Sequence, residues 1–220
     1  HILPAVVSAL VFLGCWESYV ALTETSPLVL PAPSDVLNGL RVERAALARH
    51  AAATIGVAGI GFSLSVLFAV LVSVALHFAG WLRRGMMPLL VASQTVPIVA
   101  LAPMIIVVLY SVGVQGLLPK AVISAYLSFF PVVVGMVKGL RAPDSMQMDL
   151  MRTYNADKRT VLNKLRFPSS VPYLFASLKI AIAASLVGAI VGELPTGAVA
   201  GLGARLLAGS YYGQTVQIWS

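Results

Sequence analysis

Two long stretches of this chain contain no charged side chain. Residues 51–76 and 85–119 lack Asp, Glu, Lys and Arg, and in the whole chain 59% of residues are hydrophobic and only 10% are charged. A soluble domain carries far more charge on its surface than this. A helix of about 20 apolar residues crosses the hydrocarbon core of a bilayer. We therefore expect an integral membrane protein with an all-α fold, a polytopic transmembrane helical bundle.

Apolar segments predict five to six membrane spans within a single transmembrane domain, residues 1–220. The five complete spans are expected at residues 2–22, 51–79, 86–112, 119–138 and 172–197. A sixth is expected to start near Tyr211 and to continue past the last residue. Because the chain begins at His1 rather than Met and stops as this segment opens, we expect it to be part of a longer sequence.

The basic residues indicate how the chain is oriented in the membrane. If the loops alternate sides, nine of the fifteen Lys and Arg residues lie in segments 80–85 and 138–171, five lie on the opposite side, and Lys179 falls inside a span. Cytoplasmic loops carry an excess of Lys and Arg, so loop 138–171 is expected in the cytoplasm. The same distribution explains the net charge of +7 by membrane topology, and no nucleic-acid partner is expected.

The outer segment, residues 23–50, contains the sequence LVLPAPSDVLNGL. Pro31 and Pro33 favour an extended backbone, and Ser34 or Asp35 can cap a following helix. That helix is expected to run to about Leu47. Because its sequence mixes apolar with charged side chains, it is expected to lie on the membrane surface. A plain connector between two spans is the alternative.

Prolines interrupt the third span at positions 88, 97 and 103. Each interior proline removes one helical hydrogen bond and frees a carbonyl, which in a membrane must be satisfied by neighbours or by water in a cavity. A broken helix that lines a solute pathway is therefore one interpretation, and helix packing alone is the other. The pathway candidates are Ser93, Gln94, Thr95 and Pro97, together with Glu193 at the end of the fifth span.

Small residues recur at every fourth position of the fifth span, at Ala184, Gly188 and Gly192. Such a ridge lets another helix approach closely. The partner helix can belong to the same chain or to a second copy.

The segment MDLMRTYNADKRTVLNKLRFP, residues 148–168, contains signals for two short helices. Asn155 accepts the left-handed conformation that ends a helix, and Asp157 can cap the next helix. In that second helix Val161, Leu162 and Leu165 are expected to form an apolar face surrounded by Lys158, Arg159, Lys164 and Arg166, and Pro168 and Pro172 are expected to end it. Exposed Met151, Tyr154 and Leu162 favour docking into a partner groove. A solvated loop that only fixes topology is the alternative.

This segment resembles the EAA loop of binding-protein-dependent ABC transporter permeases, which reads E-A-A-x-x-x-G-A and closes with a hydrophobic residue and Pro. Asp149, Leu150 and Met151 stand at the E-A-A positions, so the carboxylate is kept and both alanines are replaced by larger residues. Asn155 stands in place of the Gly, Ala156 matches the Ala, and Phe167-Pro168 forms the closing pair.

Further segments extend the resemblance over nearly the whole chain, to permeases of the nitrate, sulfonate and taurine type. They are CWESYVAL with LPAPSDVLNGL, PIVALAPMIIVVLYSVG, FFPVVVGMVKGL and VGELPTGAVAGLGARL. The resemblance implies a type I importer permease in the bacterial inner membrane, with residues 143–170 as a cytoplasmic coupling loop. The residues it assigns to ATPase coupling are Asp149, Leu150, Met151, Arg152, Tyr154, Asn155, Ala156, Asp157, Lys158 and Leu162.

The resemblance also implies partners. They are cytoplasmic ATPase subunits, an extracytoplasmic solute-binding protein, a second copy of this chain and the lipid membrane. The chain itself is expected to be no enzyme and to bind no cofactor or metal, with ATP and Mg on the ATPase subunit. The sequence contains no Gly-Lys pair and hence no G-x-x-x-x-G-K-[ST] phosphate loop. Sulfonate, taurine, nitrate and vitamin or pyrimidine precursors remain open as solutes.

A secondary transporter or channel that works without ATP is the main alternative. Ion-coupled carriers keep ionisable groups near the membrane midplane. The candidates here are few and lie toward the ends of spans: Glu17, Glu193, His77 and Lys179. A scaffold or an enzyme subunit is a third class, but the sequence has no cluster with metal-ligand spacing and no nucleophile paired with a base.

Overall fold

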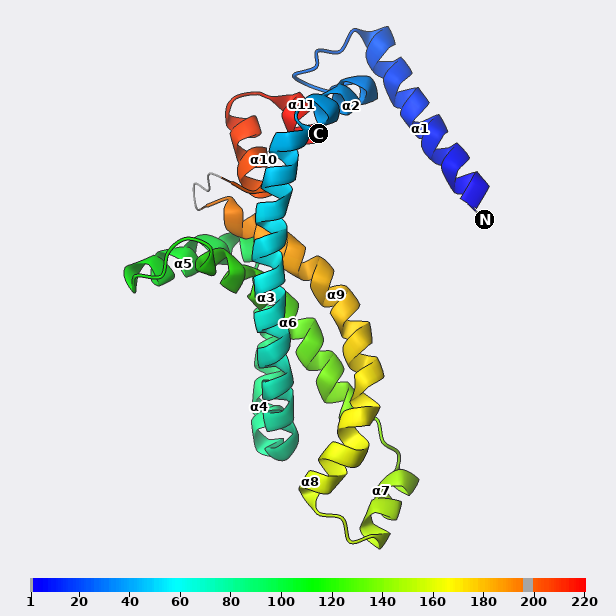
Figure 1. Ribbon diagram of the computed structural model, residues 1–220, viewed down its shortest axis with the longest axis vertical. Coiled ribbons are helices and arrows are strands. Elements are labelled where there is room, and N and C mark those ends of the chain that lie inside the picture. The colour runs from blue at the N-terminus through cyan, green and yellow to red at the C-terminus, as the bar shows by residue number, and fades with distance from the viewer. Residues whose placement is uncertain (1, 196–199) are drawn as a thin grey trace. The chain divides into compact units, whose positions relative to one another are not determined.

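The computed structural model describes residues 2–195 and 200–220, all of them helical or in short connections (Figure 1). The all-α prediction is thus confirmed for the part of the chain that is described. The helices are α1 Ile2–Thr23, α2 Pro33–Val42, α3 Arg44–Phe78, α4 Gly80–Ser93, α5 Ile98–Ser111, α6 Leu118–Gly139, α7 Ser145–Thr153, α8 Lys158–Val161, α9 Phe167–Glu193, α10 Leu202–Tyr211 and α11 Thr215–Trp219. A π-helical turn, Leu162–Arg166, joins α8 to α9.

Among the residues that the structure describes, four helical segments are long and apolar enough to cross a membrane. They are Leu3–Thr23, Arg44–Phe78, Leu118–Gly139 and Lys158–Glu193. Helices α4 and α5 have only 14 residues each and pass the same test only as a pair, which is bent by 107°. With that pair counted as one broken span, the number reaches the five complete spans predicted from the sequence.

The chain divides into two compact units. One comprises the described residues of 1–54 and 197–220, and the other those of 55–196. The first contains the outer segment and the C-terminal helices, and the second contains the proline-broken pair, α6, α9 and the segment that resembles an EAA loop.

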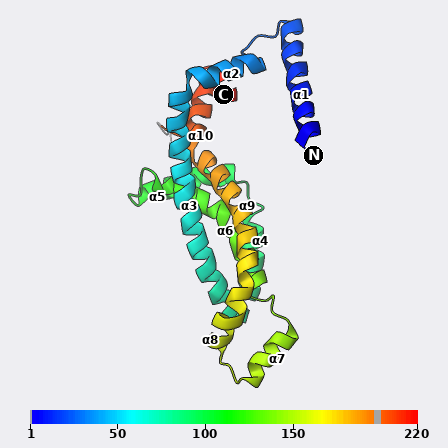
Figure 2. The same ribbon diagram turned by 45° about the vertical axis from the view of Figure 1, so that its right-hand side comes forward.

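The tightest helix packing in the second unit is the antiparallel contact between α6 and α9, which lie side by side in Figures 1 and 2. A Cβ atom added to Gly188 would lie 2.7 Å from the Cα of Ser124, and one added to Gly139 would lie 2.7 Å from the Cα of Ser170. The Ser124 hydroxyl donates to the Ser185 carbonyl at 2.7 Å. The small ridge predicted in the fifth span therefore packs against α6 of the same chain.

Helix α3 completes the core of this unit. Its buried Ala69 and Leu76 belong to one apolar cluster with Val132 and Met136 of α6 and with Ala181 of α9. The Ser73 hydroxyl donates to the Val133 carbonyl at 3.4 Å, a polar contact between two buried apolar helix faces.

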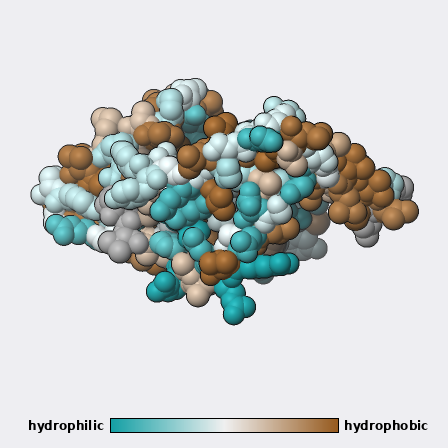
Figure 3. Space-filling view, turned by 90° about the horizontal axis from the view of Figure 1, so that it is seen from above, coloured by the Kyte–Doolittle hydropathy of each residue, from teal (hydrophilic) through white to brown (hydrophobic). Residues whose placement is uncertain are grey.

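Polar contacts organise the first unit. The Glu17 carboxylate of α1 accepts hydrogen bonds from the backbone N–H and the hydroxyl of Ser34, at 3.0 and 2.7 Å, which places a negative charge at the start of α2. Arg205 of α10 pairs with Glu43 at 2.6 Å. The rest of α1 is largely exposed and apolar, as a membrane span requires, and its hydrophobic residues cover the right-hand end of the view in Figure 3.

A helix forms in the outer segment, as predicted, but it begins and ends at other residues than expected. Its N-cap is Ala32 rather than Ser34 or Asp35, because Pro33 occupies the first helical turn, where a missing N–H costs nothing. Helix α2 ends at Val42 rather than near Leu47. Helix α3 then begins at Arg44, seven residues before the predicted span, since the intervening alanines and leucine favour a helix.

One further boundary was wrong. Pro168 and Pro172 do not separate a short helix from the fifth span, because a continuous helical segment runs from Lys158 to Glu193. The π-helical turn, in which the backbone hydrogen bonds are shifted by one residue, precedes Pro168 and accommodates the N–H that this proline lacks. Helix α10 ends at Tyr211, a turn with Gly213 at a φ of +65° follows, and α11 occupies Thr215–Trp219, so the expected sixth span, which would continue past the last residue, stays a prediction.

We expect Gly188→Ala to destabilise the protein by about 1–3 kcal/mol, because the new methyl group would overlap the α6 backbone. Thermal unfolding of the protein in nanodiscs would measure the loss. Gly59→Ala is the matched control: nothing lies within 4 Å of the Cβ position in this α3 glycine. Equal melting temperatures for the two variants would contradict the close contact.

Candidate functional site

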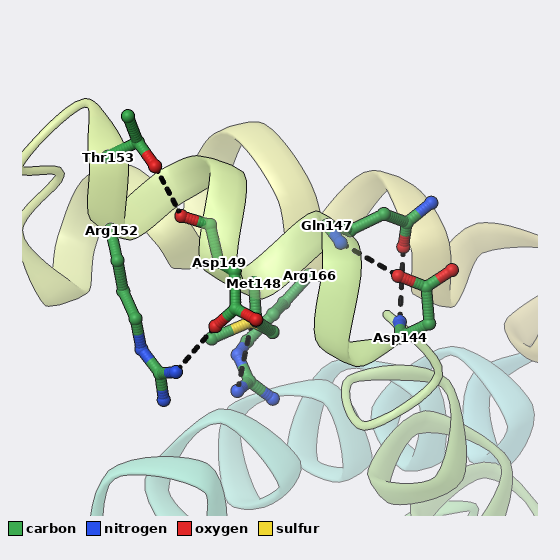
Figure 4. A network of polar contacts seen from close by, with 7 residues as sticks. All are labelled: Asp144, Gln147, Met148, Asp149, Arg152, Thr153 and Arg166. Carbon is green, nitrogen blue, oxygen red and sulfur yellow. Dashed lines mark hydrogen bonds and ion pairs between the residues drawn. The ribbon is translucent and has the colours of Figure 1, made fainter.

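Helix α7 begins with a complete capping box (Figure 4). The Asp144 carboxylate accepts the backbone N–H of Gln147 at 2.7 Å, and the Gln147 side chain accepts the N–H of Asp144 at 3.2 Å. This exchange satisfies two backbone donors that a helix start otherwise leaves unpaired. A helix of nine residues is thereby fixed at its first turn.

The other end of α7 closes in a Schellman motif. The N–H of Asn155 donates to the Arg152 carbonyl at 2.8 Å, and the N–H of Ala156 donates to the Met151 carbonyl at 3.0 Å. Asn155 has a φ of +48°, which confirms the left-handed conformation expected of it. Both ends of α7 are therefore tied by hydrogen bonds within the segment.

Asp157 caps α8, as the sequence predicted. Its carboxylate accepts the N–H of Thr160 at 3.1 Å. Hydrogen bonds from Thr160 hold the pKa of the Asp157 carboxyl below its usual value, so the cap keeps its charge at neutral pH. The two short helices meet at Asn155 and Ala156, and the second continues directly into α9.

Helix α7 presents two different faces. Met146, Leu150 and the C-cap residue Tyr154 are spaced by four residues, lie on one side and are exposed, with Tyr154 at 76%. Met148 and Arg152 lie on the opposite side and line a cavity with residues of α3 and α8. Since successive residues of a helix turn by 100°, the two sets point about 160° apart.

Two of the apolar residues expected on the docking surface are not exposed. Met151 is half-buried, and Leu162 is only 8% exposed because it packs into the cluster that contains Leu140, the C-cap residue of α6. Leu162 therefore anchors α8 to the bundle and is not available to a partner. The flanking Lys158, Arg159 and Lys164 are exposed as predicted.

Arg166 was predicted to belong to the charged rim, but it is half-buried and tethers three elements. One guanidinium NH2 group donates to the Leu140 carbonyl at the end of α6 at 2.8 Å. The other contacts the Sδ of Met148 in α7 at 3.5 Å (Figure 4). Arg166 stands four residues after Leu162, on the same face of the helix. Because Leu162 is apolar, this spacing could have predicted from the sequence that Arg166 points toward the bundle.

The proline-broken pair carries four of the pathway candidates at its bend. Pro97 has no N–H, and the carbonyl four residues earlier, that of Ser93, accepts the hydroxyl of Tyr126 from α6 at 2.6 Å. The hydroxyls of Ser93 and Thr95 donate to carbonyls of α4 at 2.7 Å. The break is thus fixed by polar contacts, and Gln94, Thr95 and Pro97 are exposed.

Glu193 does not join this group. It is the last residue of α9 and only 1% exposed, and the preceding Gly192 packs near Lys120 of α6. The break is held at Tyr126, six residues further along α6. In this conformation Glu193 therefore lies inside the protein and lines no shared surface with Ser93, Gln94, Thr95 and Pro97.

Comparison with known proteins identifies the family to which these features belong. Residues 61–219 match the binding-protein-dependent transport system inner membrane component family. The chain is a member of that family. It is an ABC transporter permease subunit, an inner membrane component with a transport function rather than an enzyme, and the predicted family, function and location are confirmed.

Several curated relatives are similar over most of the chain. The formylaminopyrimidine transport permease protein ThiX of Halalkalibacterium halodurans is 34% identical over 80% of this chain and 69% of its own length. The riboflavin transport system permease protein RibX of Chloroflexus aurantiacus is 30% identical over 91% and 74%. The taurine transport system permease protein TauC of Escherichia coli is 25% identical over 88% and 71%.

We expect Arg166→Gln to loosen α7, because a hydrogen bond from a charged group contributes about 1.5–3 kcal/mol. Hydrogen–deuterium exchange of the α7 amides should then accelerate by about tenfold or more. Lys164→Gln removes the same charge from an exposed position of the same turn and should leave exchange unchanged. Unchanged protection of α7 in Arg166→Gln would show that the tether does not hold this helix.

Proposed function

We propose that residues 143–170 couple this permease to a cytoplasmic ATPase subunit, as the EAA loop does in the family it resembles. The observation that carries the proposal is α7 itself: a helix capped at both ends whose outward face exposes Met146, Leu150 and Tyr154. A short, stiff helix with an apolar face is suited to a groove in a partner protein. ATP and Mg bind the partner, in keeping with the absence of a phosphate-loop sequence here.

The proposed transmission runs from α7 into the membrane. A displacement of α7 acts on Arg166 through Met148, and Arg166 is bonded to the end of α6 and belongs to the helical segment that continues as α9. The close packing of α6 on α9 makes the pair move as one body. Rocking of this body between two packings gives inward-open and outward-open states.

The pore is proposed to form from two copies of this chain, with an extracytoplasmic binding protein that delivers the solute. Gln94 and Thr95, exposed at the bend between α4 and α5, are the proposed contacts along the pathway. Neutral amide and hydroxyl groups can pair with hydrogen-bonding solutes without requiring a fixed charge on them. Glu193 acts on the pathway only if α9 moves, because it is buried in the present conformation.

The solute is proposed to be a small polar organic molecule or anion. Among the similar permeases, two carry names that refer to heterocyclic solutes, formylaminopyrimidine and riboflavin, and both are at least 30% identical to this chain. A vitamin or pyrimidine precursor is therefore our first candidate, and sulfonate, taurine and nitrate are the others. Binding measurements on the solute-binding protein of the same transporter would identify the solute.

The ATP-driven mechanism is tested in proteoliposomes that contain the assembled transporter and its binding protein. We expect uptake of the solute only when ATP and Mg are present on the ATPase side. Uptake that continues without nucleotide, driven by an ion gradient, would instead support the secondary transporter.

We expect Asn155→Val to uncouple ATP hydrolysis from uptake. A β-branched residue at a φ of +48° is strained by about 1–3 kcal/mol, so the reversal between α7 and α8 should be lost. The ratio of solute transported to ATP hydrolysed should fall about tenfold. A bulky residue in place of Ala156 should act in the same direction.

Asn155→Gly is the matched control, because glycine adopts the same backbone conformation without strain and should keep the ratio near the wild-type value. Normal uptake by Asn155→Val, with the variant correctly inserted, would refute the coupling role of this segment.

A further inference from the structure

A cavity of about 350 Å³ lies on the inward face of α7. It belongs to the second unit and is bounded by the end of α3, by α7 and by the start of the segment that continues as α9. Its lining residues are His77, Phe78, Met148, Arg152, Ala156, Lys158, Val161 and Arg166.

The lining of this cavity is cationic. Arg152, Lys158 and Arg166 come from three successive elements, His77 faces them from α3, and none of the lining residues described is acidic. The nearby carboxylates are engaged: Asp149 pairs with Arg152 at 2.6 Å, and Asp157 accepts the N–H of Thr160. In Figure 4 the Arg152 and Arg166 side chains lie on the same side of the α7 ribbon. The cavity is therefore a concave site with an excess of positive charge.

Aromatic side chains place this cavity at the level of the membrane surface. Phe78, which lines the cavity, is 51% exposed, and Trp81 at the start of α4 is 76% exposed. Phe167, at the first position of α9, is also exposed. Trp and Tyr gather at the ends of membrane-spanning helices, at the depth of the lipid headgroups, so Trp81 marks that depth for this end of the second unit.

We propose that this cavity binds the phosphate of an anionic phospholipid headgroup. Basic pockets between transmembrane helices are sites for such headgroups. The exposed ring of Phe78 offers an apolar surface for the start of an acyl chain beside the cationic groups, and this favours a lipid over a free phosphate ion. The site lies on the face of α7 opposite to Met146, Leu150 and Tyr154, although Arg152, Ala156 and Lys158, which line it, are also among the residues that the resemblance assigns to ATPase coupling.

A lipid in this position contacts α3, α7 and the start of the α8–α9 segment together. It places a negative charge among the cationic groups that line the cavity, and so favours the arrangement in which α7 is held against the bundle. The inference rests on the membrane location and on the cavity, and it holds whether or not α7 couples to an ATPase.

The test uses the assembled transporter in nanodiscs of phosphatidylglycerol, followed by exchange into phosphatidylcholine. The lipid that remains bound is counted by native mass spectrometry. The double variant Arg152→Gln with Lys158→Gln should retain about 25-fold less phosphatidylglycerol, from about fivefold for each cationic group removed.

The control, Arg159→Gln with Lys164→Gln, removes the same charge from exposed positions of the same segment that do not line the cavity. It should change retention by less than about twofold, because these side chains do not converge on the cavity and act on the headgroup only through screened solvent. If the first double variant fails to assemble, Lys158→Gln is compared with Lys164→Gln in the same way, with a fivefold difference expected.

Three results would overturn the proposal. Equal retention in the cavity variant and the control would show general surface attraction. Displacement of the lipid by millimolar inorganic phosphate would show a site for a soluble anion. Retention by the permease alone that is lost when the ATPase subunit is added would show that an acidic group of the partner fills the cavity. The lipid site is supported if the cavity variant, but not the control, loses its bound phosphatidylglycerol. This difference should be seen in the full complex and in the presence of phosphate.

Discussion

The close approach of α6 and α9 is the contact on which the second unit depends. Within a membrane there is no hydrophobic gain from bringing two apolar helices together, so their association rests on packing and on hydrogen bonds. Gly139 and Gly188 let the backbones meet, and the hydroxyl of Ser124 bonds across the contact. Because both helices lead toward the cytoplasmic segment, the same contact makes them a rigid support for α7.

Helix α7 owes its fixed position to this support. Its ends are closed by local hydrogen bonds, which would form in a detached segment as well, but its attachment to the bundle goes through Arg166. Burial of Leu162 against α6 fixes the start of the helical segment that carries this arginine. Local capping thus makes the helix stiff, and tertiary contacts decide where it points.

The two faces of α7 have different proposed functions. The outward face is apolar and exposed, which suits a protein groove, while the inward face borders a cavity lined by cationic groups of α8 and of the π-helical turn that follows it. A helix of nine residues can present both faces because a spacing of four keeps each set of residues on its own side.

The bend between α4 and α5 is also fixed by hydrogen bonds. There the donors are side chains, which replace backbone hydrogen bonds that the helix loses at the proline.

The sequence by itself determined the all-α membrane class, the break at Pro97, the left-handed Asn155 and the Asp157 cap, because each follows from residues within a few positions of one another. The tertiary structure alone decided that Gly188 meets α6 of the same chain, that Leu162 and Glu193 are buried, and that Arg166 turns inward. It also decided that Pro168 lies within a continuous helix, since a π-helical turn precedes it. These outcomes depend on which distant helix covers each face, and a local pattern carries no information about that neighbour.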